Sequence, residues 1–262
     1  MEQRAVVEDA VARLAEEGYC VLENLIPPDT ATRLDQLSRH AIQQSSAWAS
    51  AGYLSLEGAL NRVPELAQLI EHPIPLAIAE LVLGSASFEQ YNNVALKWVR
   101  PGTGAGGLHA DWPQNQTPPP WPEKCPMLQC FWALTPFTEA NGATRCVPFS
   151  HHTRRGPART EYRDQEKALV AGAGACVLFV SGLWHRQGAN TSASEHRMAA
   201  NLCYCPTWWT RPAGGWPLLE REVYDSLSPR VQALSASSVE GREVAASVHP
   251  HTRAVQQRQH RL

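Results

Sequence analysis

The sequence predicts a mainly β domain with flanking helices, and two patterns support this fold class. Residues 1–85 carry apolar side chains at helical spacing, whereas between about 86 and 210 short apolar runs alternate with Gly, Pro and Asn. Short strands separated by such turns are typical of a β-sandwich or β-barrel. The chain has 262 residues, enough for one well-cored domain. We therefore expect a single domain over 1–262, made of the helical part, the β core and a variable extension over 211–262.

Helices are expected mainly in the first third of the chain. In the opening segment Val7, Val11 and Leu14 recur at helical spacing, and Gly18 ends the pattern. Proline at the start of a helix is favoured because its missing N–H would have no partner there. Further helices are expected from Pro28, over 64–70, over 75–83 as far as Gly84, and near 218–227.

Strands are expected over 19–22, 91–99, 128–134, 144–147, 175–180 and 198–206. Between the second and third of these lie a Gly-rich loop, 101–107, and a Pro-rich segment, 112–126. Proline fixes φ and removes a backbone donor, so the Pro-rich segment is expected to be a long ordered loop. Long loops inside compact domains are often functional.

Composition narrows the class of protein. The net charge of −2 and the scattered Lys and Arg residues indicate neither a nucleic-acid partner nor an anionic membrane surface. No window offers the ~20 apolar residues of a membrane span, and charges interrupt the first twenty residues, where a secretory signal would be apolar. The seven cysteines form no CxxC pair. We expect a cytoplasmic monomer or homodimer whose partner is a small molecule.

The pair His109 and Asp111 carries the main chemical signal. Residues two apart on a strand point to the same side, so an imidazole and a carboxylate can converge on one metal ion. A second imidazole is available at His185, which follows the apolar run 176–180. Two histidines and one carboxylate on one face of an octahedron are typical of non-haem iron(II) oxygenases, which keep three positions open.

Two further features strengthen this interpretation. Arg197 lies at the start of the next expected strand, and a guanidinium there can bind a dicarboxylate through two parallel hydrogen bonds. Residues 141–144, Asn-Gly-Ala-Thr, make a tight turn between His109 and His185.

Five stretches in this order resemble the phytanoyl-CoA dioxygenase family of iron(II)/2-oxoglutarate oxygenases. They are EDAVARLAEEGYCVLENLIPPD, LIEHPIPLAIAELVLG, GGLHADW, LQCFWALTPFTEANGATRCVPFSHH and FVSGLWHRQGANTSASEHRMAANLCY. The resemblance covers about residues 8–204. It implies a double-stranded β-helix core (a jelly roll, cupin-like) with flanking helices. It also implies Fe(II), 2-oxoglutarate as co-substrate and O₂, with decarboxylation to succinate and CO₂.

The resemblance assigns roles by position. It makes His109, Asp111 and His185 the iron ligands and pairs Arg197 with the far carboxylate of 2-oxoglutarate. His196 is an alternative by spacing, although an imidazole does not suit a two-bond clamp.

Other positions are expected around the co-substrate. Asn92 or Asn93 matches a place where the family has a polar side chain on 2-oxoglutarate, and a one-residue slip would exchange them. Trp132 matches an aromatic side chain beside the co-substrate, and Gln129 is expected to point into the pocket.

The sequence departs from the family pattern at Gly174-Ala175, where the family often has Gly-Asp; the missing Asp caps a turn. Related halogenases replace the metal carboxylate with a small residue, so the presence of Asp111 disfavours halogenation.

The substrate is expected to be a small organic molecule, such as a natural product or an amino-acid-like metabolite. Aromatic side chains suit an apolar or ring-bearing ligand. We expect at least one of four tryptophans to contact it: Trp112, Trp121, Trp208 and Trp209. No basic cluster for a CoA thioester is evident. Two alternatives remain, a zinc-dependent hydrolase using the same ligands and a catalytically inactive jelly-roll binding module.

Overall fold

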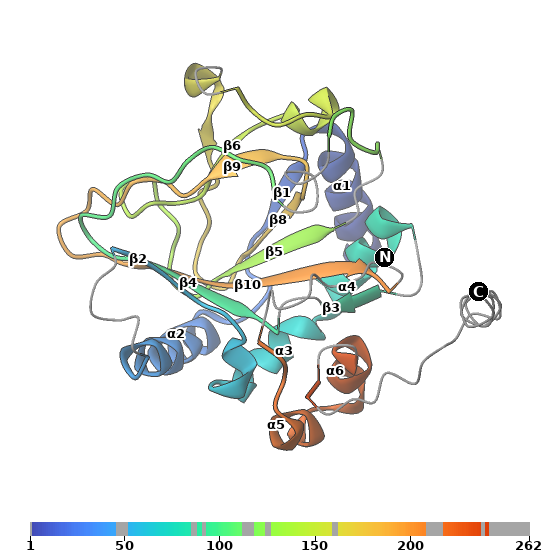
Figure 1. The fold of residues 1–262 in the computed structure, drawn as a ribbon, viewed down its shortest axis with the longest axis vertical. Helices are drawn as coiled ribbons and strands as arrows, with labels where there is room; N and C mark the ends of the chain where they lie inside the picture. Colours follow the sequence, from blue (N-terminus) through green and yellow to red (C-terminus); the bar gives the residue numbers. More distant parts are fainter. Residues whose placement is uncertain are drawn as a thin grey trace, which may run out of the picture.

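The computed structural model describes residues 2–45, 52–84, 88–90, 93–111, 118–123, 127–158, 162–207, 217–236 and 239–240. Two antiparallel sheets lie at its centre, the smaller one above the larger in Figure 1, with helices α2 and α3 below the larger sheet. The expected mainly β architecture with flanking helices, consistent with a jelly-roll core, is therefore confirmed.

The element bounds agree closely with the pattern of apolar residues. The helices are α1 (Glu2–Glu16), α2 (Pro28–Gln43), α3 (Ala67–Ile70), α4 (Pro73–Leu83), α5 (Arg221–Ser226) and α6 (Pro229–Leu234), with short 3-10 turns at Ala59–Asn61, Pro64–Leu66, Ser150–Thr153 and Arg163–Gln165. The strands are β1 (Tyr19–Leu22), β2 (Tyr53–Leu56), β3 (Phe88–Gln90), β4 (Ala95–Val99), β5 (Leu128–Ala133), β6 (Arg145–Val147), β7 (Lys167–Ala168), β8 (Cys176–Val180), β9 (Trp184–Arg186) and β10 (Arg197–Pro206).

The larger sheet has the order β1-β8-β5-β10-β4-β2, with β3 also paired to β10, and the smaller sheet has the order β7-β6-β9. Two strands of the larger sheet, β1 and β2, come from the mainly helical part of the chain, 1–85; β1 was expected over 19–22, whereas β2 was not expected. They pair with β8 and β4, respectively, at the two ends of this order. The first part of the chain therefore supplies both the helical cover and two strands of the sheet.

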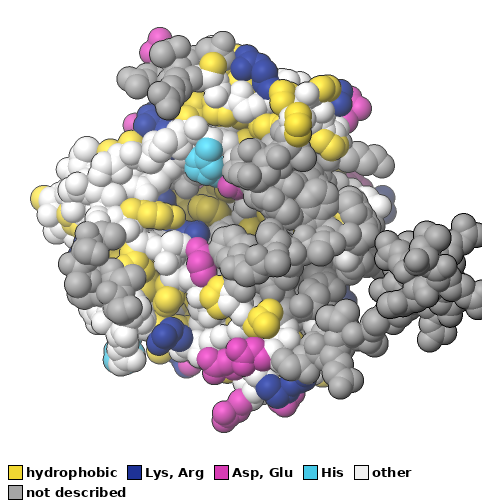
Figure 2. Space-filling model, in the orientation of Figure 1, with side chains coloured by type: hydrophobic (Ala, Val, Ile, Leu, Met, Phe, Trp, Pro, Cys, Tyr) yellow, Lys and Arg dark blue, Asp and Glu magenta, His cyan; other side chains and the backbone are white. Residues whose placement is uncertain are grey.

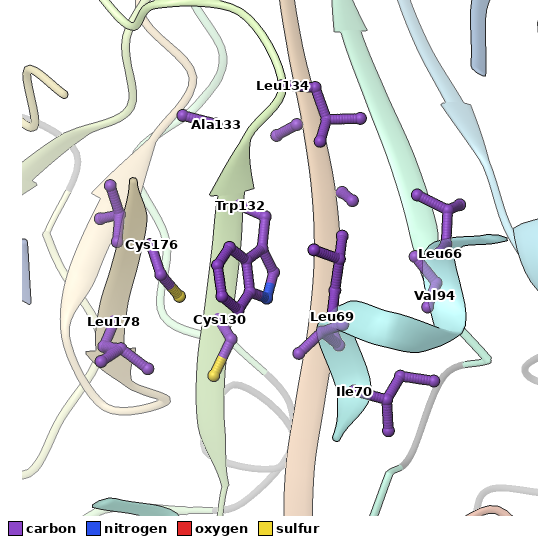
Figure 3. Close-up of a cluster of buried hydrophobic side chains, with 14 of the residues drawn as sticks. Leu66, Leu69, Ile70, Val94, Cys130, Trp132, Ala133, Leu134, Cys176 and Leu178 are labelled. Atoms are coloured by element: carbon purple, nitrogen blue, oxygen red, sulfur yellow. The ribbon is translucent and has the colours of Figure 1, made fainter. Parts of the chain in front are cut away.

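The face of the larger sheet that is turned toward the helices forms the main core. Trp132 projects from β5 beside Leu69 of α3, as Figure 3 shows, and Cys130 and Ile70 belong to the same buried cluster. On β10 the hydroxyl of Tyr204 donates to the carbonyl oxygen of Ile70 at 2.6 Å. Successive strand residues point to opposite faces, so the alternate residues of these strands face the other sheet.

The helix expected near 218–227 is present as α5, Arg221–Ser226, and a second helix that was not expected, α6, follows it. The chain is extended at Leu227, which ends α5, and Ser228 is the N-cap of α6. Within the described ranges no single helix has the length and apolar run needed to cross a membrane. The neighbouring segments Pro64–Ile70 and Pro73–Leu83, bent by 55°, meet that length and composition test only when taken together.

The expected strand 91–99 is shorter in the structure, where β4 begins at Ala95. Asn93 and Val94 have positive φ values of 49° and 58°, a left-handed conformation that ends a strand. Their carbonyl oxygens accept hydrogen bonds from the backbone of Leu60 and Ala59. Residues 91 and 92 lie outside the described part of the chain.

Gly174 joins the segment before α2 to the turn that leads into β8. Its carbonyl oxygen accepts from the N–H groups of Leu25 and Ile26, both at 3.1 Å, and its own N–H donates to Ala133 at 2.8 Å. It has φ +87°, and a Cβ atom here would collide with the carbonyl oxygen of Ile26. This turn therefore depends on glycine both for its conformation and for its space.

We expect Gly174→Ala to lower the free energy of unfolding by more than about 2 kcal/mol, since it adds a backbone clash to the cost of a left-handed alanine. Gly84→Ala is the matched control. Gly84 also has a positive φ, +63°, but a Cβ there would meet nothing within 4 Å, so only about 1–2 kcal/mol should be lost. Urea denaturation of both variants measures the difference, and equal losses would show that the Ile26 contact relaxes freely.

Candidate metal centre

Two segments far apart in sequence are joined by backbone hydrogen bonds at the candidate site. The N–H of His109 donates to the carbonyl of His185 at 3.0 Å, and the N–H of His185 donates back at 2.8 Å. The N–H of Asp111 donates to the carbonyl of Ser181 at 3.0 Å. His109 lies in an isolated β-bridge rather than on a strand as expected, whereas His185 lies on β9. The bridge places their side chains next to each other.

The three predicted metal ligands converge. Oδ1 of Asp111 lies 3.7 Å from Nε2 of His109 and 3.6 Å from Nε2 of His185. One ligand atom from each residue lies within 4.8 Å of the others. Two ligands that each lie about 2.1 Å from one ion can be at most about 4.2 Å apart, so both carboxylate–imidazole separations suit a shared metal ion.

Backbone carbonyls orient both imidazole rings. Nδ1 of His109 lies 2.8 Å from the carbonyl oxygen of Gly107, and Nδ1 of His185 lies 2.9 Å from that of Leu183. A carbonyl can only accept, so each Nδ1 carries the proton and each Nε2 presents a lone pair to the centre of the site. Burial lowers the pKa of His185, against the opposing effect of Asp111, and this favours the neutral imidazole that metals bind.

A cavity of about 570 Å³ opens between the two sheets beside this cluster. Figure 2 looks onto its mouth, with a histidine and acidic side chains at the rim and hydrophobic and basic side chains deeper in. The cavity is lined by Tyr53, Lys97, Gly106, Gly107, His109, Asp111, Met127, Gln129, Phe131, Thr144, His185, Arg186, Gln187, Arg197, Asn201 and Cys203. The structure thus brings the triad, Arg197 and Gln129 to one cavity.

Arg197 is a buried cation in this cavity, only 1% exposed. Its Nε donates to the carbonyl oxygen of Gly142 at 3.2 Å, and its guanidinium lies 5.2 Å from the ring centre of Phe137. Nη1 has no hydrogen-bond partner among the described residues. Burial lowers the pKa of Arg197 to about 10, with an opposing effect from Tyr53. The group is therefore charged at neutral pH and has a donor left for an anion.

His196, the alternative to Arg197, lies outside the cavity. Its Nε2 is 3.0 Å from Oδ1 of Asp35, whose other oxygen accepts from Arg39. Residues 196 and 197 are neighbours on the chain and point in opposite directions. The structure therefore leaves only Arg197 of the two facing the candidate site.

Three predicted site residues lie elsewhere. Trp132 is fully buried on the helical face of the sheet, because it shares the strand parity of Cys130 rather than that of Gln129. The side-chain amide of Asn93 donates to the carbonyl of Pro217 at 2.9 Å and does not line the cavity. Trp121 is buried in a small cluster with Trp184, Val147 and Ala110. Asn92, Trp112, Trp208 and Trp209 lie outside the described residues.

The sequence reasoning missed several polar residues of the cavity: Tyr53, Lys97, Thr144, Asn201 and Cys203. The alternation of side chains along a strand could have predicted two of them. Asn201 and Cys203 lie four and six residues after Arg197 on β10 and therefore face the same side. Lys97 also stands out as a charge between Leu96 and Trp98. It donates to Ser55 at 2.5 Å and to Glu57 at 2.7 Å.

Comparison with known proteins finds related chains over most of this length. The family model for phytanoyl-CoA dioxygenase (PhyH) matches residues 14–199. Dioxygenase af480 of Aspergillus fumigatus is 28% identical over 247 residues, covering 88% of this chain and 77% of that protein. The multifunctional dioxygenase ausE of Aspergillus calidoustus is 26% identical over 254 residues, covering 88% and 83%, respectively.

Solved structures share the fold. The epimerase SnoN, in complex with Fe3+, alpha ketoglutarate and nogalamycin RO, is 18% identical with a TM-score of 0.65, covering 81% of this chain and 88% of that one. The non-heme alpha ketoglutarate dependent carbocyclase SnoK from nogalamycin biosynthesis is 22% identical with a TM-score of 0.60, covering 76% and 83%.

We expect Arg197→Met to raise the free energy of unfolding by about 1–3 kcal/mol in the absence of ligands. It replaces a buried cation, which has no carboxylate partner among the described residues, with an apolar side chain. Arg186→Met should instead lower the free energy of unfolding, by about 1–2 kcal/mol. Arg186 donates to the buried Glu166 at 2.9 and 2.7 Å, and that carboxylate would lose those bonds. Denaturant titration measures both, and destabilisation by Arg197→Met would mark Arg197 as structural.

Proposed function

Because the chain belongs to the phytanoyl-CoA dioxygenase family, and is thereby a non-haem iron dioxygenase, we propose that His109, Asp111 and His185 hold Fe(II) and that Arg197 binds 2-oxoglutarate. One observation carries the proposal. Two Nε2 lone pairs and a carboxylate oxygen converge in the same cavity as a buried guanidinium, one of whose donors has no partner in the described part of the chain. The two imidazoles and the carboxylate suit a divalent metal ion, and the guanidinium suits a dicarboxylate.

The donor set fits iron. Two neutral imidazoles and one carboxylate on one side of an ion are the ligands of non-haem iron(II) oxygenases. When bound, the metal activates O₂ for oxidation of a C–H bond, with 2-oxoglutarate as the source of two electrons. The backbone bridge between His109 and His185 holds the two rings before the metal arrives, which reduces the ordering that binding requires.

For the co-substrate, Arg197 would anchor the carboxylate far from the metal. The guanidinium is buried and charged, and its fixed fork matches a carboxylate. Two other cationic side chains line the cavity, and both already have a carboxylate partner. Lys97 pairs with Glu57, and Arg186 pairs with Glu166. These pairs leave Arg197 as the favoured anchor.

We propose a small organic substrate, such as a natural product or an amino-acid-like metabolite. A cavity of about 570 Å³ is within the usual size of small-molecule sites. Its cations are placed for the co-substrate or already paired, which does not suit the phosphates of a CoA thioester. The balanced reaction is substrate C–H, O₂ and 2-oxoglutarate giving C–OH, succinate and CO₂. The substrate's position determines whether oxidation ends in hydroxylation, desaturation, cyclisation or epimerisation.

Anaerobic titration of the metal-free protein with Fe(II) and then 2-oxoglutarate should produce the weak visible charge-transfer band of the chelate. We expect the wild type to show this band and His185→Ala to lose it, because two ligands bind iron far more weakly than three. His152→Ala is the matched control. His152 contacts the backbone of Glu16 at 2.9 Å and lies away from the cavity, so the band should persist.

The alternatives predict different results. Bound metal without a band, together with turnover that needs neither O₂ nor 2-oxoglutarate, would identify a metal hydrolase. Failure of the wild type to bind Fe(II) would identify a binding module and overturn the proposal.

Arg197→Ala should weaken 2-oxoglutarate binding about 10- to 100-fold, the effect of losing charge-assisted hydrogen bonds in a buried site. Fe(II) affinity measured without 2-oxoglutarate should stay the same, because Arg197 is not a ligand. The 2-oxoglutarate affinity of Arg197→Lys should lie between those of the wild type and Arg197→Ala, since an ammonium keeps the charge but not the forked donor geometry. An unchanged 2-oxoglutarate requirement in Arg197→Ala would remove this residue from the site.

A further inference from the structure

The two oxygens of Asp111 have different surroundings. Oδ1 faces the Nε2 atoms of His109 and His185. Oδ2 accepts a hydrogen bond of 2.7 Å from Nε2 of Gln129, which lies on β5. The sequence placed Gln129 in the pocket as a co-substrate residue, but its amide is directed at the carboxylate. One oxygen is thus presented to the metal position and the other is held from behind.

The direction of the Gln129 amide is set by two donors on the neighbouring strand β10. Its Oε1 accepts from Nδ2 of Asn201 at 2.9 Å and from the thiol of Cys203 at 2.7 Å. Burial raises the pKa of the Cys203 thiol, so its proton is retained. With donors on the oxygen side, the amide nitrogen must face Asp111.

The sheet itself supports this arrangement. Gln129 and Cys203 are direct partners in the β5–β10 register, and Asn201 is two residues away on the same face. The three side chains are buried, at 6%, 4% and 5% exposure, respectively. The remaining direction of the Gln129 amide nitrogen is occupied by Sδ of Met127 at 3.7 Å. Its amide is therefore engaged on both sides and has little capacity left for a ligand.

We infer that Gln129 is a positioning residue that holds the Asp111 carboxylate with Oδ1 toward the metal position, and that Asn201 and Cys203 hold Gln129 in place. The inference rests on the proposed iron site. Without the hydrogen bond to Oδ2 the carboxylate can rotate, and metal binding must then order it. The Gln129 amide therefore strengthens Fe(II) binding by orienting a ligand before the metal arrives.

The test is the dissociation constant for Fe(II), measured anaerobically without 2-oxoglutarate. Gln129→Leu keeps a similar volume and removes the donor, so we expect the constant to rise about 10- to 100-fold, as for other residues that orient metal ligands. Thr144→Val is the matched control. It also exchanges a buried polar group of this cavity for an apolar one of similar size, and the constant should remain within about twofold.

A double-mutant cycle tests the chain of bonds. Asn201→Ala alone should raise the constant less than Gln129→Leu does, and it should have no further effect once Gln129 is replaced, because it acts only through that amide. Asn201→Ala still tests the inference if Gln129→Leu does not fold. Denaturation of the metal-free variants will show whether each of them folds.

The outcomes separate the inference from the proposed function. Wild-type protein that binds no Fe(II) would overturn both. If the wild type binds Fe(II), two results would overturn the positioning role alone. One is a dissociation constant of Gln129→Leu equal to that of the wild type, and the other is strictly additive effects of the two substitutions.

Discussion

The backbone bridge between His109 and His185 is the constraint on which the site depends. It joins two segments that are 76 residues apart in sequence by two hydrogen bonds of 3.0 and 2.8 Å. Residues paired in this way project their side chains to the same side, so the two imidazoles meet without any long loop having to order them. The third bond, from Asp111 to Ser181, brings the carboxylate to the same place. The proposed metal ligands are therefore brought together by main-chain pairing.

Strand parity then divides the larger sheet into a packing face and a chemical face. On β5 Cys130 and Trp132 pack against the helices, whereas Gln129 and Phe131 line the cavity. A register slip of one residue would exchange these faces and place Leu128 or Cys130 where the Gln129 amide meets the Asp111 carboxylate. The apolar residues that bury the helical face thereby also fix the chemistry on the opposite face. In this sheet one strand register both buries the apolar side chains and sets the positions of the side chains in the cavity.

This division explains what could be predicted from the sequence. The strands β5, β8 and β10 were predictable because each is mainly apolar, and the proposed triad because His109 and Asp111 stand two apart. The short strand β2 was not, since its pairing with β4 is set by distant contacts rather than by local propensity. Trp132 was misplaced for a related reason. Positional resemblance set it beside the co-substrate, although the spacing from Cys130 already indicated the packing face.

Charge explains why the cavity tolerates Arg197. Lys97 and Arg186 are compensated by Glu57 and Glu166, which leaves Asp111 and Arg197 as the opposite charges facing the cavity. The proposed ligands are a divalent cation and a dianion, so loading both leaves the total charge unchanged. Loading the cation alone would leave two excess positive charges beside a buried guanidinium, a costly state at low dielectric. The co-substrate removes that excess, so each proposed ligand should strengthen the binding of the other.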